Sequence, residues 1–218
     1  MQKQYIFNDI TDESVSFNVL ISTPNDYDNE KESLPLIVFL HGAGERGDDI
    51  NLIKLLGIPK LFDKSSPVRA VTLSPQCKSD KVWNSQVYAL KHLIDSVVRK
   101  YNIDKSRISI TGLSMGGFGT WEMAITFPGF FSAVAPLCGG GMSWRAALIG
   151  KTPVWAFHGM SDTVVEPMYS EVMVNAVNNG GGNAKLSLYP GVGHDVWVNA
   201  YEHEPLLQWL IEQKNCYM

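Results

Sequence analysis

The sequence has no long run of apolar residues. Its longest apolar stretches, residues 34–40 and 154–157, have the length of a β-strand, whereas a membrane-spanning helix needs about 18 apolar residues or more. Residues 1–9 contain neither an apolar segment nor a small-residue cleavage site of the kind that directs secretion. We therefore expect a soluble protein that has no membrane partner and is located in the cytoplasm.

Basic residues and cysteines are both scarce. The 18 Lys and Arg residues against 22 Asp and Glu residues give a net charge of −4. Because the basic residues are scattered and form no stripe along a phosphate backbone, nucleic acid is not an expected partner. The cysteines, Cys77, Cys138 and Cys216, are odd in number and stand at unrelated spacings, which predicts reduced thiols and not a disulfide framework.

The apolar pattern predicts one domain, residues 1–218, without internal repeats or linkers. Two alternating runs, Tyr5–Asn8 and Val15–Ser22, predict an antiparallel pair at a sheet edge. Later runs alternate little, as strands covered on both faces do: Leu36–Leu40, Ala70–Leu73, Ile108–Thr111, Ala133–Leu137, Val154–Phe157 and Leu186–Tyr189. Helical patterns lie between most of them, at Ser85–Tyr101, Met115–Phe127, Pro167–Asn178 and Pro205–Gln213.

This alternation of strands and helices predicts the α/β class, with a mostly parallel, doubly wound sheet and an antiparallel N-terminal edge. Between the strands that end near Leu137 and begin near Val154 there are only a Gly-rich turn and residues 143–149. These few residues leave no room for a helical lid domain. We therefore expect an open cleft.

One serine lies in a context that exposes and activates it. Gly112-Leu-Ser-Met-Gly116 follows a predicted strand and opens a predicted helix, and in that setting a G-x-S-x-G string forms a sharp turn with the serine at its tip. Glycines two positions before and after the serine let strand and helix pass closely. A Gly-Ser loop without chemistry fits the pentapeptide alone, but the flanking elements favour Ser114 as a nucleophile.

A serine nucleophile needs a histidine base, and the histidine needs a carboxylate partner. His194 follows the last predicted strand in a Gly-rich loop and is the candidate base; the alternative is an exposed loop histidine. Asp162, just after the strand Val154–Phe157, is the candidate acid, with a turn-forming role as its alternative. Asp195 ranks second because neighbouring side chains in an extended loop diverge. The other histidines are expected to order loops (His41, His158) or to lie on the surface (His92, His203).

The charge that develops on an acyl oxygen needs N–H donors. We expect one donor at Met115, directly after the nucleophile, and the other at Ala43 in the loop His41-Gly-Ala-Gly-Glu-Arg-Gly47, with Gly44 as the alternative. This loop has neither G-x-G-x-x-G nor the Lys-Ser/Thr of a P-loop, which disfavours phosphate binding.

Four motifs, His41-Gly-Ala-Gly-Glu-Arg-Gly47, Gly112-Leu-Ser-Met-Gly-Gly117, His158-Gly-Met-Ser-Asp162 and Gly193-His-Asp195, together resemble a family of small serine carboxylesterases. These are similar to polyhydroxybutyrate depolymerases and to feruloyl and acetylxylan esterases, and some members carry the label "predicted peptidase". The resemblance implies an α/β-hydrolase fold and a Ser114, Asp162, His194 triad in that chain order. It also implies that Glu45, Arg46 and Trp83 lie near the acyl or leaving-group pocket, although Trp83 and Trp197 fit equally well as core residues.

The sequence thus predicts a serine carboxylesterase for a small-molecule ester. The reaction would form an acyl-enzyme and would require no metal and no cofactor. Short acyl or aryl esters, including those of plant-polysaccharide fragments, are the expected substrates, because an open cleft offers little apolar tunnel for a long chain. A thioesterase or lysophospholipase with the same triad, or a catalytically inactive binding protein on the same fold, are the alternatives.

Overall fold

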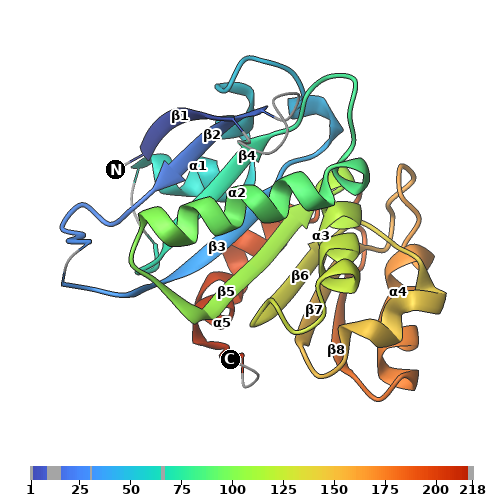
Figure 1. Cartoon of the computed structure of the whole chain (residues 1–218). Coiled ribbons are helices and arrows are strands. Elements are labelled where there is room, and N and C mark those ends of the chain that lie inside the picture. Colours follow the sequence, from blue (N-terminus) through green and yellow to red (C-terminus); the bar gives the residue numbers. More distant parts are fainter. Residues whose placement is uncertain (1, 9–15, 30, 65–66, 216–218) are drawn as a thin grey trace.

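The molecule is built on one large β-sheet. A computed structural model describes residues 2–8, 16–29, 31–64 and 67–215, and shows eight strands in the order β1-β2-β4-β3-β5-β6-β7-β8 (Figure 1). Neighbours from β4 to β8 are parallel, whereas β1 with β2 and β2 with β4 are antiparallel. The strands are β1 (Gln2–Asn8), β2 (Ser16–Ser22), β3 (Leu34–Leu40), β4 (Val71–Gln76), β5 (Ile103–Leu113), β6 (Ala133–Leu137), β7 (Pro153–Gly159) and β8 (Asn183–Tyr189).

This sheet confirms the predicted fold class, including the antiparallel N-terminal edge. The hairpin between β1 and β2 was placed correctly, although Val15, at which the second strand was expected to begin, lies outside the described residues, as does Cys216.

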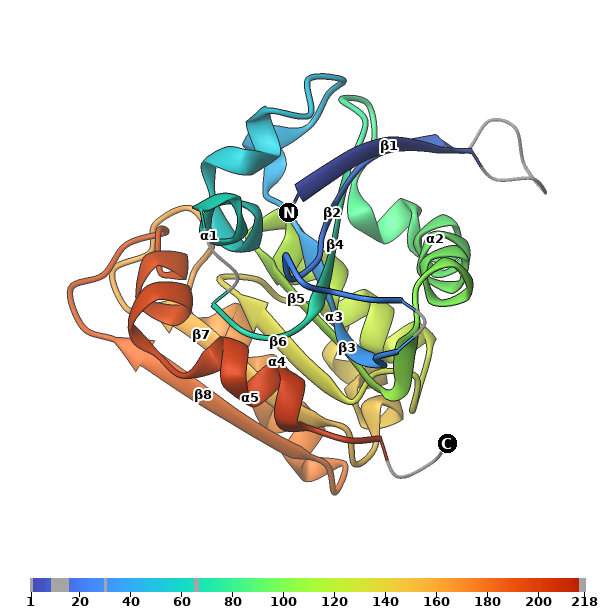
Figure 2. The ribbon, with the colours of Figure 1, turned by 90° about the vertical axis from the view of Figure 1, so that its left-hand side faces the viewer.

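Helices cover both faces of the sheet. α2 (Val87–Lys100), α3 (Met115–Thr126) and α4 (Met168–Asn179) lie on one face, and α1 (Gly57–Lys64) and α5 (Leu206–Glu212) lie on the other (Figures 1 and 2). A buried apolar cluster lies under each layer of helices. In the described part of the chain, no helix combines the length and the apolarity that a membrane crossing requires.

Helix α1 is not among the predicted helices. It has 8 residues, and its Gly-Ile-Pro beginning looks like a loop in the sequence. Gly57 has a positive φ of 60°, and a Cβ at this position would lie 2.5 Å from the ring of Phe39. The glycine is therefore required both for the turn into the helix and for its close contact with β3.

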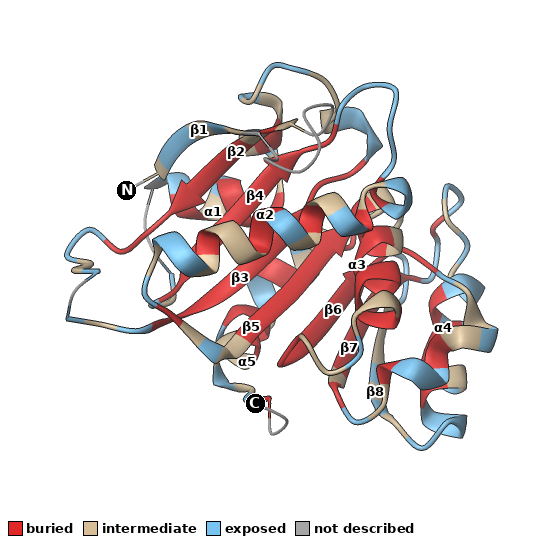
Figure 3. Cartoon of the chain, in the orientation of Figure 1, coloured by how far each residue is buried: buried red, intermediate tan, exposed pale blue. Residues whose placement is uncertain are grey.

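The central strands are buried along most of their length (Figure 3). Every residue of β3 and β4 is buried, which explains why these runs do not alternate. Strand β8 differs from its prediction, because none of its residues is fully buried. It lies at the edge of the sheet and pairs with β7, so the prediction that it is covered on both faces was wrong.

The carboxyl ends of the parallel strands collect the candidate site residues at one edge of the sheet. The loop 41–47 follows β3, Ser114 follows β5, Asp162 follows β7 and His194 follows β8. Open α/β sheets bind their ligands at this edge. Between β6 and β7 the chain forms only a short 3₁₀-helix, η4 (Ser143–Ile149), so no helical lid domain is inserted there.

Candidate active site

Ser114 lies at the tip of a strained turn between β5 and α3. Its backbone has φ 55° and ψ −119°, a region that non-glycine residues adopt only when the surrounding structure holds them there. A Cβ on Gly112 would lie 2.5 Å from the Gly116 carbonyl oxygen, and one on Gly116 would lie 1.9 Å from the Leu40 carbonyl oxygen. Both positions therefore require glycine, and the tight crossing holds the partly exposed serine at the end of the strand.

The structure brings Ser114, His194 and Asp162 into one hydrogen-bonded chain. The Nε2 atom of His194 lies 2.9 Å from the Ser114 Oγ, and its Nδ1 lies 2.7 Å from the Asp162 Oδ2. The three residues are separated by 80 and 32 positions in sequence. Asp195, the second-ranked acid, is exposed, and its side chain makes no such contact with His194 among the described interactions.

Asp162 is held as a buried carboxylate. Its side chain has no exposed surface, and its Oδ1 accepts the backbone N–H groups of Val164 and Val165 at 2.8 and 3.0 Å. Burial on its own would raise the pKa of this carboxyl, but the hydrogen bonds from His194 and from these two amides outweigh it, and the pKa lies below its usual value. Asp162 therefore stays ionised and can stabilise a protonated His194.

A second histidine holds the loop that carries Asp162. His158 is fully buried; its Nε2 lies 2.8 Å from the Val165 carbonyl oxygen and its Nδ1 lies 2.7 Å from the Ser170 Oγ. Burial lowers the pKa of His158, so the ring is neutral and donates from Nε2 to the Val165 carbonyl. The Ser170 Oγ lies within hydrogen-bond distance of both the His158 Nδ1 and the Gly139 carbonyl oxygen, at 2.7 and 2.9 Å. The expectation that His158 orders a loop is confirmed.

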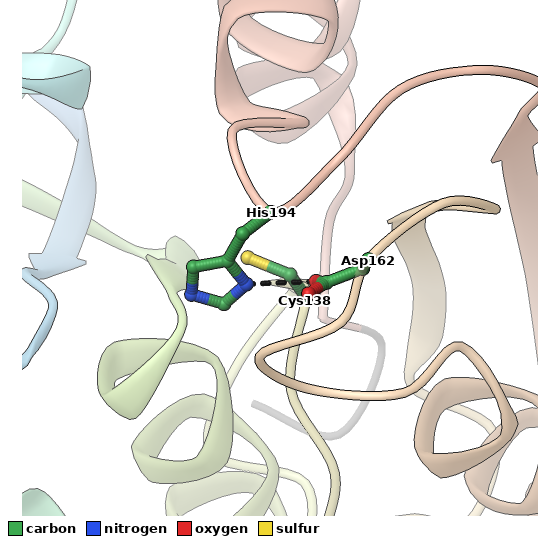
Figure 4. Close-up of side chains that lie close together, drawn as sticks. All are labelled: Cys138, Asp162 and His194. Carbon is green, nitrogen blue, oxygen red and sulfur yellow. Dashed lines mark hydrogen bonds and ion pairs between the residues drawn. The ribbon is translucent and has the colours of Figure 1, made fainter.

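Cys138 lies next to Asp162 and His194, directly after β6, and its place there was not predicted from the sequence. Figure 4 shows its side chain converging with those of Asp162 and His194, and ligand atoms of the three residues lie within 4.8 Å of one another. A metal ion would require a thiolate, but burial raises the pKa of the Cys138 thiol. Because Asp162 and His194 already bind each other, we assign Cys138 to the packing that supports them. Its position directly after a predicted parallel strand could have indicated from the sequence that Cys138 lies at this edge of the sheet.

Buried side chains orient the loop that follows β3. The Nε2 of His41 accepts the Cys77 N–H at 2.9 Å, so its Nδ1 carries the proton and donates to the Gly42 carbonyl at 2.6 Å. Burial lowers the pKa of His41 to about 4, which keeps the ring neutral. In a trans peptide the N–H points opposite to the carbonyl. The Ala43 N–H therefore points away from buried His41, toward the outside of the loop.

Trp83 belongs to this support and not to a pocket. Its ring has no exposed surface, packs edge-on against His41 with centroids 5.0 Å apart, and donates its indole N–H to the His41 carbonyl at 2.9 Å. The implied place of Trp83 beside substrate is therefore wrong. A tryptophan in a loop gives no sequence signal that separates these two roles.

Glu45 and Arg46 also belong to the loop. Arg46 Nε donates to the Ala43 carbonyl at 3.0 Å. The Glu45 side chain is 14% exposed and its Oε2 lies 3.9 Å from the His41 Nδ1, and burial raises the pKa of this carboxyl. The Glu45 side chain adjoins the turn beside Ser114, since a Cβ on Gly42 would lie 3.0 Å from the Glu45 Oε2 and 3.7 Å from the Ser114 Cβ.

Known proteins are similar to this chain in sequence or in structure. A thermostable esterase of known structure is 31% identical and superposes with a TM-score of 0.85 over 98% of this chain and 63% of its own. The poly(3-hydroxyalkanoate) depolymerase C of Paucimonas lemoignei is 40% identical over 55 residues, which are 25% of this chain and 13% of that protein. A bifunctional acetylxylan esterase/xylanase of Neocallimastix patriciarum is 30% identical over 90 residues, which are 41% of this chain and 12% of that protein. The chain thus spans less than two thirds of the length of each relative.

The family assignment comes from a longer match. The model of the phospholipase/carboxylesterase family matches residues 68–203, a range that contains Ser114, Asp162 and His194 together with the strands that carry them. Its extent, more than half of the chain, shows that this protein belongs to the phospholipase/carboxylesterase family of α/β-hydrolases.

Proposed function

We propose that this chain is a serine esterase in which Ser114, His194 and Asp162 form the catalytic triad. The observation that carries the proposal is the unbroken chain of hydrogen bonds from the Ser114 Oγ through His194 to the buried Asp162. It is supported by membership in a family of carboxylesterase-type hydrolases.

The proposed reaction has two steps. Ser114 attacks the ester carbonyl carbon while His194 Nε2 takes the serine proton, and His194 then gives this proton to the departing alcohol, which leaves an acyl-enzyme. Water attacks the acyl-enzyme and loses its proton to His194. The bond between the acyl carbon and the Ser114 Oγ then breaks, the serine oxygen takes the proton from His194, and the acid is released. Asp162 holds the proton on Nδ1 throughout, so that Nε2 is free to accept.

Two backbone N–H groups are proposed to stabilise the oxyanion of each step. The Met115 N–H begins α3 next to Ser114, where first-turn amides have no partner within the helix. The Ala43 N–H is directed by the hydrogen bond between His41 and the Gly42 carbonyl. Because buried His41 fixes the Gly42–Ala43 peptide, the Ala43 N–H would be oriented before the substrate binds, as electrostatic stabilisation requires.

The Ala43 donor can be removed with little change to the backbone. Ala43 is the first residue of the 3₁₀-helix Ala43–Glu45, and Gly42 before it is extended (φ −77°, ψ −176°), as a residue before proline must be. We expect Ala43→Pro to fold and to lower kcat about a hundredfold. Steady-state kinetics on a short ester would measure this. A normal rate in the folded variant would move the donor to Gly44.

Short acyl or aryl esters are the proposed substrates. The names of the relatives, an esterase, an acetylxylan esterase and a poly(3-hydroxyalkanoate) depolymerase, support ester cleavage. The short η4 segment between β6 and β7 supports an uncovered site, which would bind a long acyl chain poorly.

A series of acetyl, butyryl, octanoyl and feruloyl esters would test this function. We expect hydrolysis of the acetyl, butyryl and feruloyl esters and a fall in kcat/KM at octanoyl. Higher kcat/KM on an acyl thioester or a lysophospholipid would favour the thioesterase or lysophospholipase alternative. No turnover of any ester, together with no labelling by a fluorophosphonate probe, would leave a catalytically inactive binding protein.

A further inference from the structure

An aromatic side chain lies one helical turn beyond Ser114 and has no part in the proposed reaction. Phe118 donates its backbone N–H to the Ser114 carbonyl at 3.1 Å, so its Cα lies one turn along α3 from the serine. Cα–Cβ bonds of a helix tilt toward its N-terminus. The Phe118 side chain therefore extends back toward Ser114, and it remains partly exposed.

A second aromatic ring completes a pair. Tyr169, in the first turn of α4, meets the Phe118 ring edge to face, with centroids 6.2 Å apart and planes at 62°. A Cβ on Gly140 would lie 2.8 Å from the Tyr169 Cβ, so this part of Tyr169 rests against the backbone that follows β6. Yet 49% of Tyr169 is exposed, and the pair therefore presents aromatic surface to solvent.

The surroundings of this pair are apolar, and their charge is negative. Val164, two residues after Asp162, is 71% exposed, and Met168 is 53% exposed. The segment 160–172 contains the exposed Glu166 and Glu171 and no Lys or Arg. Apolar surface beside a reactive group is typical of a substrate site, and the charge around it disfavours a phosphate-bearing or carboxylate-bearing substituent.

We propose that Phe118 and Tyr169 bind an uncharged aromatic ring of the ester substrate. This inference rests on the proposed esterase function and adds a specificity that the triad does not determine. An incoming ring can pack against the pair with the offset or edge-to-face geometry that aromatic rings prefer. The ring can belong either to the acyl group or to the alcohol, and the two sources are separable by experiment.

The test compares phenyl esters with cyclohexyl esters that have the same chain and a six-membered ring of similar size. Ethyl hydrocinnamate against ethyl cyclohexanepropanoate places the ring on the acyl side, and benzyl acetate against cyclohexylmethyl acetate places it on the alcohol side. In the wild type we expect kcat/KM to favour the phenyl ester in one of these two pairs. Phe118→Leu and Tyr169→Leu should each lower that preference about three- to tenfold, whereas Tyr169→Phe, which keeps the ring, should retain it.

The chain offers a matched control. Tyr88 and Phe127 form another edge-to-face pair, with centroids 5.7 Å apart, at the opposite end of α3 from Ser114. Tyr88→Leu should leave the phenyl preference and the rate on ethyl acetate unchanged. Circular dichroism would verify folding, and if Phe118→Leu does not fold, the Tyr169 variants decide alone.

The outcomes separate this inference from the function on which it rests. Wild-type hydrolysis of ethyl acetate without any phenyl preference, or a preference that survives both leucine variants, would overturn the aromatic site and leave the esterase standing. Failure of the wild type to hydrolyse any of the five esters would overturn both proposals.

Discussion

Replacing Ser114 with alanine is expected to lower kcat by about 10³- to 10⁶-fold, because triad residues act as a unit and only binding and oxyanion stabilisation remain. The His194 Nε2, 2.9 Å from the serine oxygen in the native chain, would then have no hydroxyl to deprotonate. Kinetics on an acetyl ester, with fluorophosphonate labelling followed by mass spectrometry, would measure the loss. A variant that keeps more than a tenth of the wild-type kcat would remove Ser114 from the role of nucleophile.

The strained backbone at Ser114 should lower the stability of the folded protein. The φ of 55° at Ser114 is accessible to glycine without strain. Ser114→Ala should therefore change the melting temperature little, while Ser114→Gly should melt at or above the wild type despite the flexibility of glycine. Clear destabilisation by both substitutions would show that the hydroxyl itself holds the turn.

The second large effect is expected at Asp162. Its Oδ1 accepts two backbone N–H groups, so an asparagine in its place would keep its oxygen there and turn its NH₂ toward His194. That group would donate to Nδ1 and force the proton of His194 onto Nε2, which is the wrong tautomer for accepting the serine proton. We expect Asp162→Asn to lower kcat by about 10³- to 10⁴-fold at neutral pH.

Asp195→Asn is the matched control for this change. Asp195 adjoins His194 in sequence but is exposed, and its replacement should lower kcat less than about tenfold. Both variants would be compared by steady-state kinetics after circular dichroism has established that they fold. The reverse ranking would transfer the role of acid to Asp195.

Sequence patterns predicted the sheet and the place of the candidate triad for a physical reason. Parallel strands covered on both faces leave short, unalternating apolar runs, and loops after such strands must meet at one edge of the sheet. Ser114 and Asp162 follow such runs, and His194 follows the parallel edge strand β8, so the sequence predicted that the three residues lie close together.

The parts that sequence could not predict depend on side-chain packing. Trp83 is drawn into the core by its contacts with Phe17 and His41, and nothing local distinguishes this from a place on the surface. Helix α1 begins with a glycine and a proline, and its contact with Phe39 favours the helix over the loop that its sequence suggests. Phe118 and Tyr169 become neighbours only because the fold brings the first turns of α3 and α4 together.

Because β8 lies at the edge of the sheet, we expect the site to lose its activity before the rest of the protein unfolds. His194 lies in the loop after this outermost strand, which pairs only with β7 among the described strands. Ser114 instead follows β5, which is paired on both sides. Local opening costs least where a strand has one neighbour and little buried surface. As the denaturant concentration rises, the loop that carries His194 should therefore unfold while Ser114 is still held by the intact central sheet.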